Sequence, residues 1–198
     1  MESSTSVNAG YKKSEATKKR ILNAAYKQFA TYGFHGASLR DIATLCGISH
    51  PGIRHHFPTK EDLFIEVLRE RDARVETLMK EHIAERGMSI DVAIEITRHN
   101  MTTPGLLELF TATAAQAGNP KHPAHDYFVQ RYEQIHAMYV EYLKLAKAQG
   151  QTRPDLDPDR AASLLMAVLD GLQIQWMLIP DKTEMDALFE ESLRSILE

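Results

Sequence analysis

The segment of residues 38–57, SLRDIATLCGISHPGIRHHF, contains two short helix patterns separated by a glycine. Ser38 is suited to cap the first helix, and Asp41, three positions later, can reach back to the free N–H groups of its first turn. Gly47 interrupts the apolar spacing where a turn requires a positive φ, and Ser49 can cap a second helix. Helix, glycine-containing turn and second helix form the helix-turn-helix arrangement, which places its second helix in the DNA major groove. The apolar face predicted for the first helix comprises Leu39, Ile42, Ala43 and Leu45.

The basic and acidic residues are unevenly distributed along the chain. Residues 1–60 contain nine Lys and Arg against three Asp and Glu, whereas residues 61–198 contain 14 against 24. The net charge of −4 therefore combines a basic N-terminal part with an acidic remainder. A protein that binds DNA needs clustered cations to neutralise phosphates, although the bases of residues 12–20 alone would equally fit a solvated tail. Together with the helix-turn-helix pattern, the cluster favours DNA binding.

Residues 14–64 resemble the N-terminal domain of the TetR family of transcriptional regulators. The shared landmarks are an alanine-rich helix ending at Phe29, a YGF turn at 32–34, the helix of 38–43, the GIS turn at 47–49, the HHF ending at Phe57 and the KEDLF helix start at Lys60. The rest of the chain resembles the family in length and helical character. The resemblance implies a DNA-binding regulator and, by the habit of the family, a repressor rather than an activator.

The expected fold is all-α with about nine helices, because helical spacing recurs along the chain and no segment shows the alternation typical of a strand. Residues 1–13 are rich in serine and lack apolar spacing, so we expect a mobile tail there. The resemblance implies a helix-turn-helix DNA-binding domain over residues 14–74 and a helical ligand-binding and dimerisation domain over residues 75–198.

The predicted DNA contacts lie in and around the two short helices. Arg54 can form a two-pronged pair with guanine or anchor a phosphate, and Arg40 can likewise reach either group. By resemblance, His55 and Lys60 occupy positions that contact phosphate in the family, whereas Arg54 stands where a tyrosine is frequent and His50 where a lysine is frequent. The full predicted set is Ser38, Arg40, Ser49, His50, Gly52, Arg54, His55 and Lys60.

The last two predicted helices, near residues 157–177 and 184–197, are apolar over more than one face. Such helices need a partner beyond their own core, and the resemblance implies that they pair with a second copy in a four-helix bundle. A twofold homodimer would present two recognition helices to a palindromic operator, whereas completion of a monomeric core is the alternative. The predicted interface comprises Leu165, Val168, Leu172, Leu188, Leu193 and Ile196.

The resemblance also implies a pocket in the C-terminal domain for an unidentified small-molecule effector, whose binding would release DNA. Met and aromatic side chains suit a flexible apolar pocket, and a few polar groups such as His99, His136 and Gln173 would orient the ligand. At helical spacing the same residues would equally form an ordinary core. The predicted lining is His99, Met101, Phe110, Tyr132, His136, Tyr139, Met166, Gln173 and Trp176.

Two other classes of function compete with this interpretation. An enzyme would need converging reactive groups, and the pair His122 and His125, a H-x-x-H without a third ligand, fits a solvated loop better than a metal site. A helical adaptor that keeps the motif but binds protein is disfavoured by the basic N-terminal part. We therefore expect no catalytic residue, metal or cofactor.

No apolar run approaches the length of a membrane span, so we also expect no membrane partner. The single cysteine, Cys46, suits the reducing cytoplasm.

Overall fold

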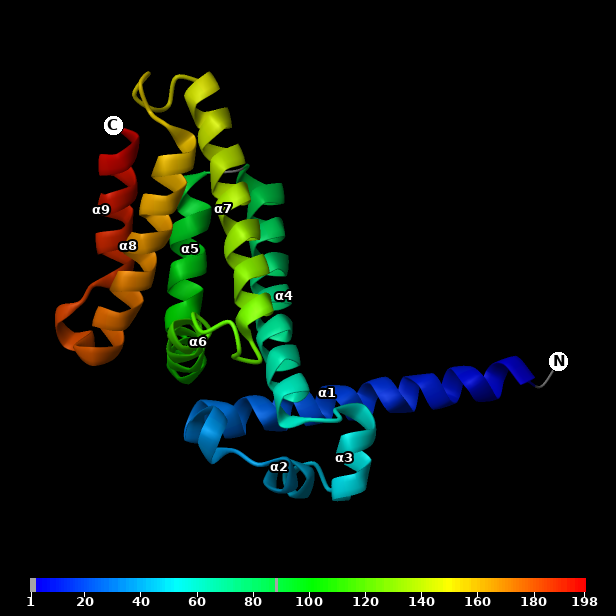
Figure 1. The fold of residues 1–198 in the computed structure, drawn as a ribbon. Helices are drawn as coiled ribbons and strands as arrows, with labels where there is room; N and C mark the ends of the chain where they lie inside the picture. Colours follow the sequence, from blue (N-terminus) through cyan, green and yellow to red (C-terminus); the bar gives the residue numbers. More distant parts are fainter. Residues whose placement is uncertain (1–2, 88) are drawn as a thin grey trace. The chain divides into compact units, whose positions relative to one another are not determined.

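A computed structural model describes residues 3–87 and 89–198 of the chain (Figure 1). All regular elements within these residues are helices, which confirms the predicted all-α fold with about nine helices. They are α1 (Ser3–Gly36), α2 (Leu39–Leu45), α3 (His50–His56), α4 (Lys60–Arg86), α5 (Ile90–Met101), α6 (Pro104–Gln116), α7 (His125–Ala148), α8 (Pro158–Leu178), the short 3₁₀ helix η1 (Pro180–Lys182) and α9 (Met185–Leu197).

The chain forms two compact units, of which the first ends at Asp72 and the second begins at Ala73. This division falls inside α4, two residues before the end of the DNA-binding domain suggested by the sequence. Helix α4 therefore contributes its first turns to one unit and its remaining turns to the other.

The core of the first unit joins all of its helices. Phe29 of α1, Ile42 of α2, Ile53 of α3 and Leu63 of α4 are each fully buried. Burying a side chain of this size contributes about 1.5–3 kcal/mol, so these contacts hold the unit together. Ile53 is the one buried residue of α3, and the placement of this short helix depends on it.

Helix α1 differs from the sequence expectation at its start and follows it at its end. Residues 3–13 are helical rather than a mobile tail, and the rest of the predicted tail lies outside the described residues. The physical reason is that extending an existing helix fixes one residue for each hydrogen bond gained, and this segment contains no proline to stop it. At the predicted YGF turn the helix is kinked, with Gly33 at φ 67°.

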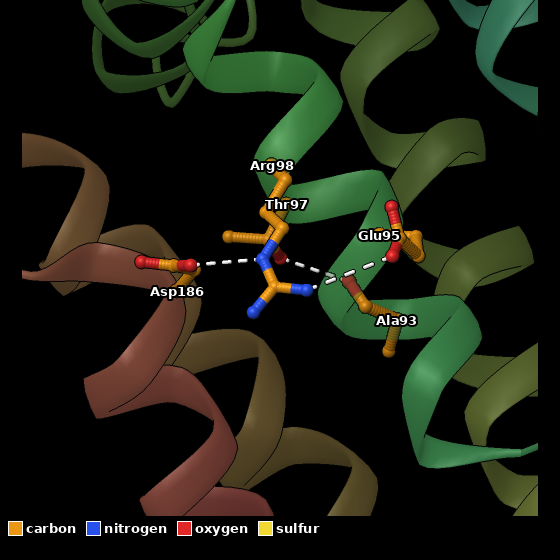
Figure 2. Close-up of polar contacts among 5 residues, drawn as sticks. All are labelled: Ala93, Glu95, Thr97, Arg98 and Asp186. Atoms are coloured by element: carbon orange, nitrogen blue, oxygen red, sulfur yellow. Dashed lines mark hydrogen bonds and ion pairs between the residues drawn. The ribbon is translucent and has the colours of Figure 1, made fainter.

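The second unit contains α5 to α9. Helix α8 lies beside α7 and α9, and α9 also packs against α5 (Figure 1). Figure 2 shows that Arg98 of α5 joins α9 through an ion pair, with its Nε 2.9 Å from Oδ2 of Asp186. This hydrogen bond holds the pKa of the Asp186 carboxyl below its usual value. The core comprises Ile94, Leu107, Val140, Leu143, Leu156, Ala161, Ala162, Leu165, Leu172, Met185, Phe189, Leu193 and Leu197.

Helix α8 is more apolar than the sequence analysis allowed. It is long and apolar enough to cross a membrane by length and composition, with a mean hydropathy of 1.4, which corrects the expectation that no such run exists. Length and composition do not distinguish a membrane span from a helix of a soluble protein. Only 28% of this apolar window is buried within the chain, so α8 retains apolar surface for a partner.

Candidate nucleic-acid interface

The start of α2 has the predicted capping arrangement. The Ser38 hydroxyl oxygen accepts from the backbone N–H of Asp41 at 3.2 Å and donates its own proton to Oδ2 of Asp41 at 2.6 Å. The hydroxyl is therefore occupied on both sides, and a phosphate would have to displace the Asp41 carboxylate to reach it. Arg40 lies exposed in the same helical turn.

The turn between the helices depends on Gly47, as predicted. Its φ of 63° lies in the left-handed region, which an L side chain adopts only with strain. The N–H of Ile48 then donates to the carbonyl of Ala43 at 3.0 Å, which ties the turn back onto α2. The predicted apolar face is wrong at one position, since Leu45 is 60% exposed. Leu45 is the last residue of α2 and follows its two buried residues, Ile42 and Ala43.

Helix α3 presents the predicted recognition residues. Ser49 caps it by accepting from the N–H of Gly52 at 3.1 Å, and a side chain at Gly52 would crowd this cap at 3.2 Å. His50, Arg54 and His55 are exposed, whereas Ile53 is fully buried. A helix so capped and anchored can offer donors to base edges and phosphates while its apolar side stays attached.

Lys60, although predicted as a DNA contact, is engaged with distant backbone carbonyls of the protein itself. Its ammonium donates to the carbonyl oxygens of Phe34 at 2.9 Å and Ala37 at 3.1 Å, and it lies 4.5 Å from the centre of the Phe34 ring. Sequence spacing could not reveal these contacts, because 23 and 26 residues separate the partners.

Two further basic residues of this unit have internal partners. The Arg20 guanidinium donates to the carbonyl of Cys46, and the Cys46 thiol lies 3.6 Å from the Arg20 carbonyl, to which it donates in return. Burial raises the pKa of the Cys46 thiol, which fits a packing role. Lys18 of α1 forms an ion pair with Glu66 of α4 at 2.7 Å. Lys18, Arg20 and Lys60, which belong to the basic N-terminal part, therefore have contacts within the described part of this unit.

The predicted effector residues divide by burial. Phe110 and Gln173 are buried, His99 is exposed, and the other predicted residues are half-buried, namely Met101, Tyr132, His136, Tyr139, Met166 and Trp176. His99, near the end of α5, is exposed to solvent and therefore does not line an enclosed pocket. His136 instead contacts α8, with Nε2 3.1 Å from the Ser163 hydroxyl.

A polar cluster between α7 and α8 includes one residue that sequence analysis missed. The Tyr132 hydroxyl donates to Oδ2 of Asp170 at 2.8 Å. Burial raises the pKa of the Asp170 carboxyl, although the Tyr132 hydrogen bond and the nearby Arg131 partly offset this effect. Burial also raises the pKa of Tyr139 to about 12. Asp170 is the sole acid between residues 160 and 180, a sequence signal that could have identified it.

The residues predicted at the dimer interface differ in how much surface they leave for a partner. Leu165, Leu172 and Leu193 belong to the core of their own unit, with 0%, 8% and 1% of their surface exposed, so they have almost no area left for a partner. Val168 and Ile196 are half-buried, and Leu188 is exposed. The large apolar side chains that α8 leaves exposed are Leu164, Ile174 and Leu178.

The H-x-x-H pair makes backbone contacts. Nδ1 of His122 accepts from the N–H of Ala124 at 3.2 Å, and Nδ1 of His125 lies 2.8 Å from the carbonyl oxygen of Ala117. Across residues 3–87 and 89–198, no group of three or more His, Cys, Asp or Glu is placed to hold a metal ion. Both histidines thus act in the connection that leads into α7.

Two protein-family models match the chain. Residues 21–67 match the model described as bacterial regulatory proteins, tetR family, and residues 91–198 match that described as BetI-type transcriptional repressor, C-terminal. The second match alone covers more than half of the chain.

Individual proteins are similar over nearly the whole chain or over its first unit. The HTH-type transcriptional repressor AcnR of Corynebacterium diphtheriae is 28% identical over 181 residues, which cover 90% of this chain and 92% of AcnR. The HTH-type transcriptional regulator RutR of Escherichia coli is 49% identical over 55 residues, which are 28% of this chain and 26% of RutR. A Saccharomonospora viridis protein solved in complex with choline matches with a TM-score of 0.71 at 26% identity, covering 91% of this chain and 95% of that one.

Proposed function

The chain belongs to the tetR family of bacterial regulatory proteins and is a DNA-binding transcriptional regulator, and we propose that it is a cytoplasmic repressor that binds a palindromic operator as a homodimer and is released by a small molecule. The observation that carries the proposal is the geometry of α3. Its Ser49 cap and its buried Ile53 leave His50, Arg54 and His55 exposed together.

Each exposed residue of α3 has a role that its chemistry suits. Arg54 would donate two hydrogen bonds to O6 and N7 of guanine, the commonest specific contact in the major groove. His50, at the helix start, and His55 would add donors to base edges or phosphate. Arg40, exposed in the first turn of α2, would anchor a phosphate and so fix the register of α3.

The homodimer would form through the exposed side of α8. Leu164 and Leu178 lie fourteen residues apart, four turns of an α-helix, and therefore on one side of α8. Gly171, halfway between them, has open space where a Cβ would be, so a second helix can approach closely there. The exposed Leu188 of α9 would add to the same surface. A twofold axis through it requires two equivalent recognition helices and hence a palindromic site.

The effector would contact the polar cluster between α7 and α8. Asp170 has a half-buried carboxylate that accepts a hydrogen bond from the Tyr132 hydroxyl and interacts electrostatically with Arg131 and Tyr139. A carboxylate beside aromatic rings suits an organic cation. Because the Saccharomonospora viridis protein was solved with choline, choline is the first probe. Choline should weaken DNA binding, and Asp170→Asn should abolish that response while leaving binding without choline unchanged.

The DNA proposal is tested by selecting bound fragments from random duplex DNA with the purified protein and titrating the enriched duplex with salt. Enrichment of a palindrome, lost in Arg54→Ala and accompanied by steep weakening as salt rises, would support it. Recovery of a non-palindromic sequence would contradict the homodimer. Weak binding that is indifferent to salt would contradict recognition through α3.

A further inference from the structure

We propose that Lys60 and Arg20 are positioning residues that hold α2 at its two ends, rather than phosphate contacts. Both belong to the basic N-terminal part of the chain, where a cation would ordinarily be assigned to the DNA backbone. Both side chains instead donate to carbonyl oxygens that flank α2. The inference concerns how the helix-turn-helix is held in place for the DNA binding described above.

Lys60 holds the segment that precedes α2. Its ammonium has three N–H donors, of which two reach the carbonyls of Phe34 and Ala37, while the Phe34 ring lies within cation–π distance. These carbonyls lie at the end of the kinked α1, where the helix dipole favours a cation. The Ala37 carbonyl directly precedes Ser38, so Lys60 fixes the residue that caps α2.

The first turn of α4, which carries Lys60, is held by a reciprocal cap between Thr59 and Asp62. The Thr59 side chain and N–H both donate to Oδ2 of Asp62, at 2.6 and 3.1 Å, and the N–H of Asp62 donates to the Thr59 hydroxyl at 3.0 Å. This reciprocal cap fixes the first turn of α4, on which Lys60 is the first helical residue. The capped first turn of α4 therefore holds the start of α2 in place through Lys60.

Arg20 holds the segment that follows α2. Its guanidinium donates to the carbonyl of Cys46, the C-cap residue that follows α2, and the Cys46 thiol returns a hydrogen bond to the Arg20 carbonyl. Because α2 has only seven residues, two such attachments determine where it lies against α1 and α4. The Gly47 turn passes this placement on to α3, whose contacts with bases tolerate displacements of only about 0.5 Å.

The test compares Lys60→Met with Lys27→Met, measured with the enriched duplex and with a scrambled duplex of equal length. Lys27 is an exposed lysine of α1, so replacing it controls for the removal of one positive charge. Binding is measured over a range of salt concentrations, at a temperature where circular dichroism shows every variant folded.

A positioning role predicts that Lys60→Met weakens binding of the enriched duplex about tenfold, since a hydrogen bond from a charged group is worth roughly that factor. Binding to the scrambled duplex, and the salt slope there, should match those of Lys27→Met. Lys60→Arg, whose guanidinium can still donate to both carbonyls, should restore most of the specific affinity, and Arg20→Met should reproduce the loss of specificity from the other end of α2.

A phosphate contact predicts a different pattern and would overturn the proposal. Lys60→Met would then weaken both duplexes equally and lower the salt slope by about 0.9 for each protomer bound, beyond the effect of Lys27→Met. The scrambled duplex decides this point even if no operator is enriched, so failure of the palindromic-operator proposal and failure of the Lys60 assignment are distinguishable.

Discussion

Replacing Leu164 by serine should strongly weaken the proposed homodimer. Leu164 is 55% exposed on α8, and full burial of a leucine side chain is worth about 1.5–3 kcal/mol, so covering its exposed half contributes about 0.8–1.6 kcal/mol. A twofold interface contains the residue twice, which doubles this value to about 1.6–3.2 kcal/mol. At about 1.4 kcal/mol for each factor of ten, the dissociation constant of the dimer should rise about 15- to 200-fold.

Sedimentation equilibrium over a range of protein concentrations measures this constant directly. Leu45→Ser is a matched control, because Leu45 is a leucine of similar exposure, 60%, in the first unit, and its change should leave the dimer constant within about twofold. An unchanged dimer constant in Leu164→Ser would refute the assignment of the exposed side of α8 to the interface. A wild-type chain that stays monomeric at micromolar concentration would refute the homodimer itself.

Three further predictions concern stability and are read from urea unfolding. Ser49→Ala removes the acceptor of the Gly52 N–H and should lower the free energy of unfolding by about 1 kcal/mol, whereas a loss below about 0.3 kcal/mol would contradict the cap. Ile53→Ala opens a cavity at a fully buried site and should cost about 2–5 kcal/mol; a smaller loss would mean that α3 is anchored elsewhere. The Asp186 carboxyl has a lowered pKa in the folded chain, so its contribution is complete above the unfolded value of about 3.9 and is lost as pH falls through the folded value. The advantage of the wild type over Asp186→Asn should therefore shrink between about pH 5 and pH 3, and a constant difference would show that the ion pair with Arg98 does not stabilise the fold.

The features that the sequence determined by itself are local. The Ser38 and Ser49 caps, and the left-handed turn at Gly47, involve hydrogen bonds or backbone angles within a few residues. Such interactions depend on residue type and spacing, so they can be recognised before any fold is known. The two-helix motif and the exposed position of Arg54 followed from them.

Only the tertiary structure decided which cations are free for DNA and which apolar side chains are free for a partner. Lys60 and Arg20 lie 23 to 26 residues from the carbonyls to which they donate, and no spacing rule connects positions so far apart. Leu164 and Leu165 are equally apolar neighbours on α8, yet one is 55% exposed and the other fully buried. Composition makes α8 apolar over more than one face, and the packing of α7 and α9 against it decides which apolar side stays exposed, because neighbouring helices bury only the faces that they contact.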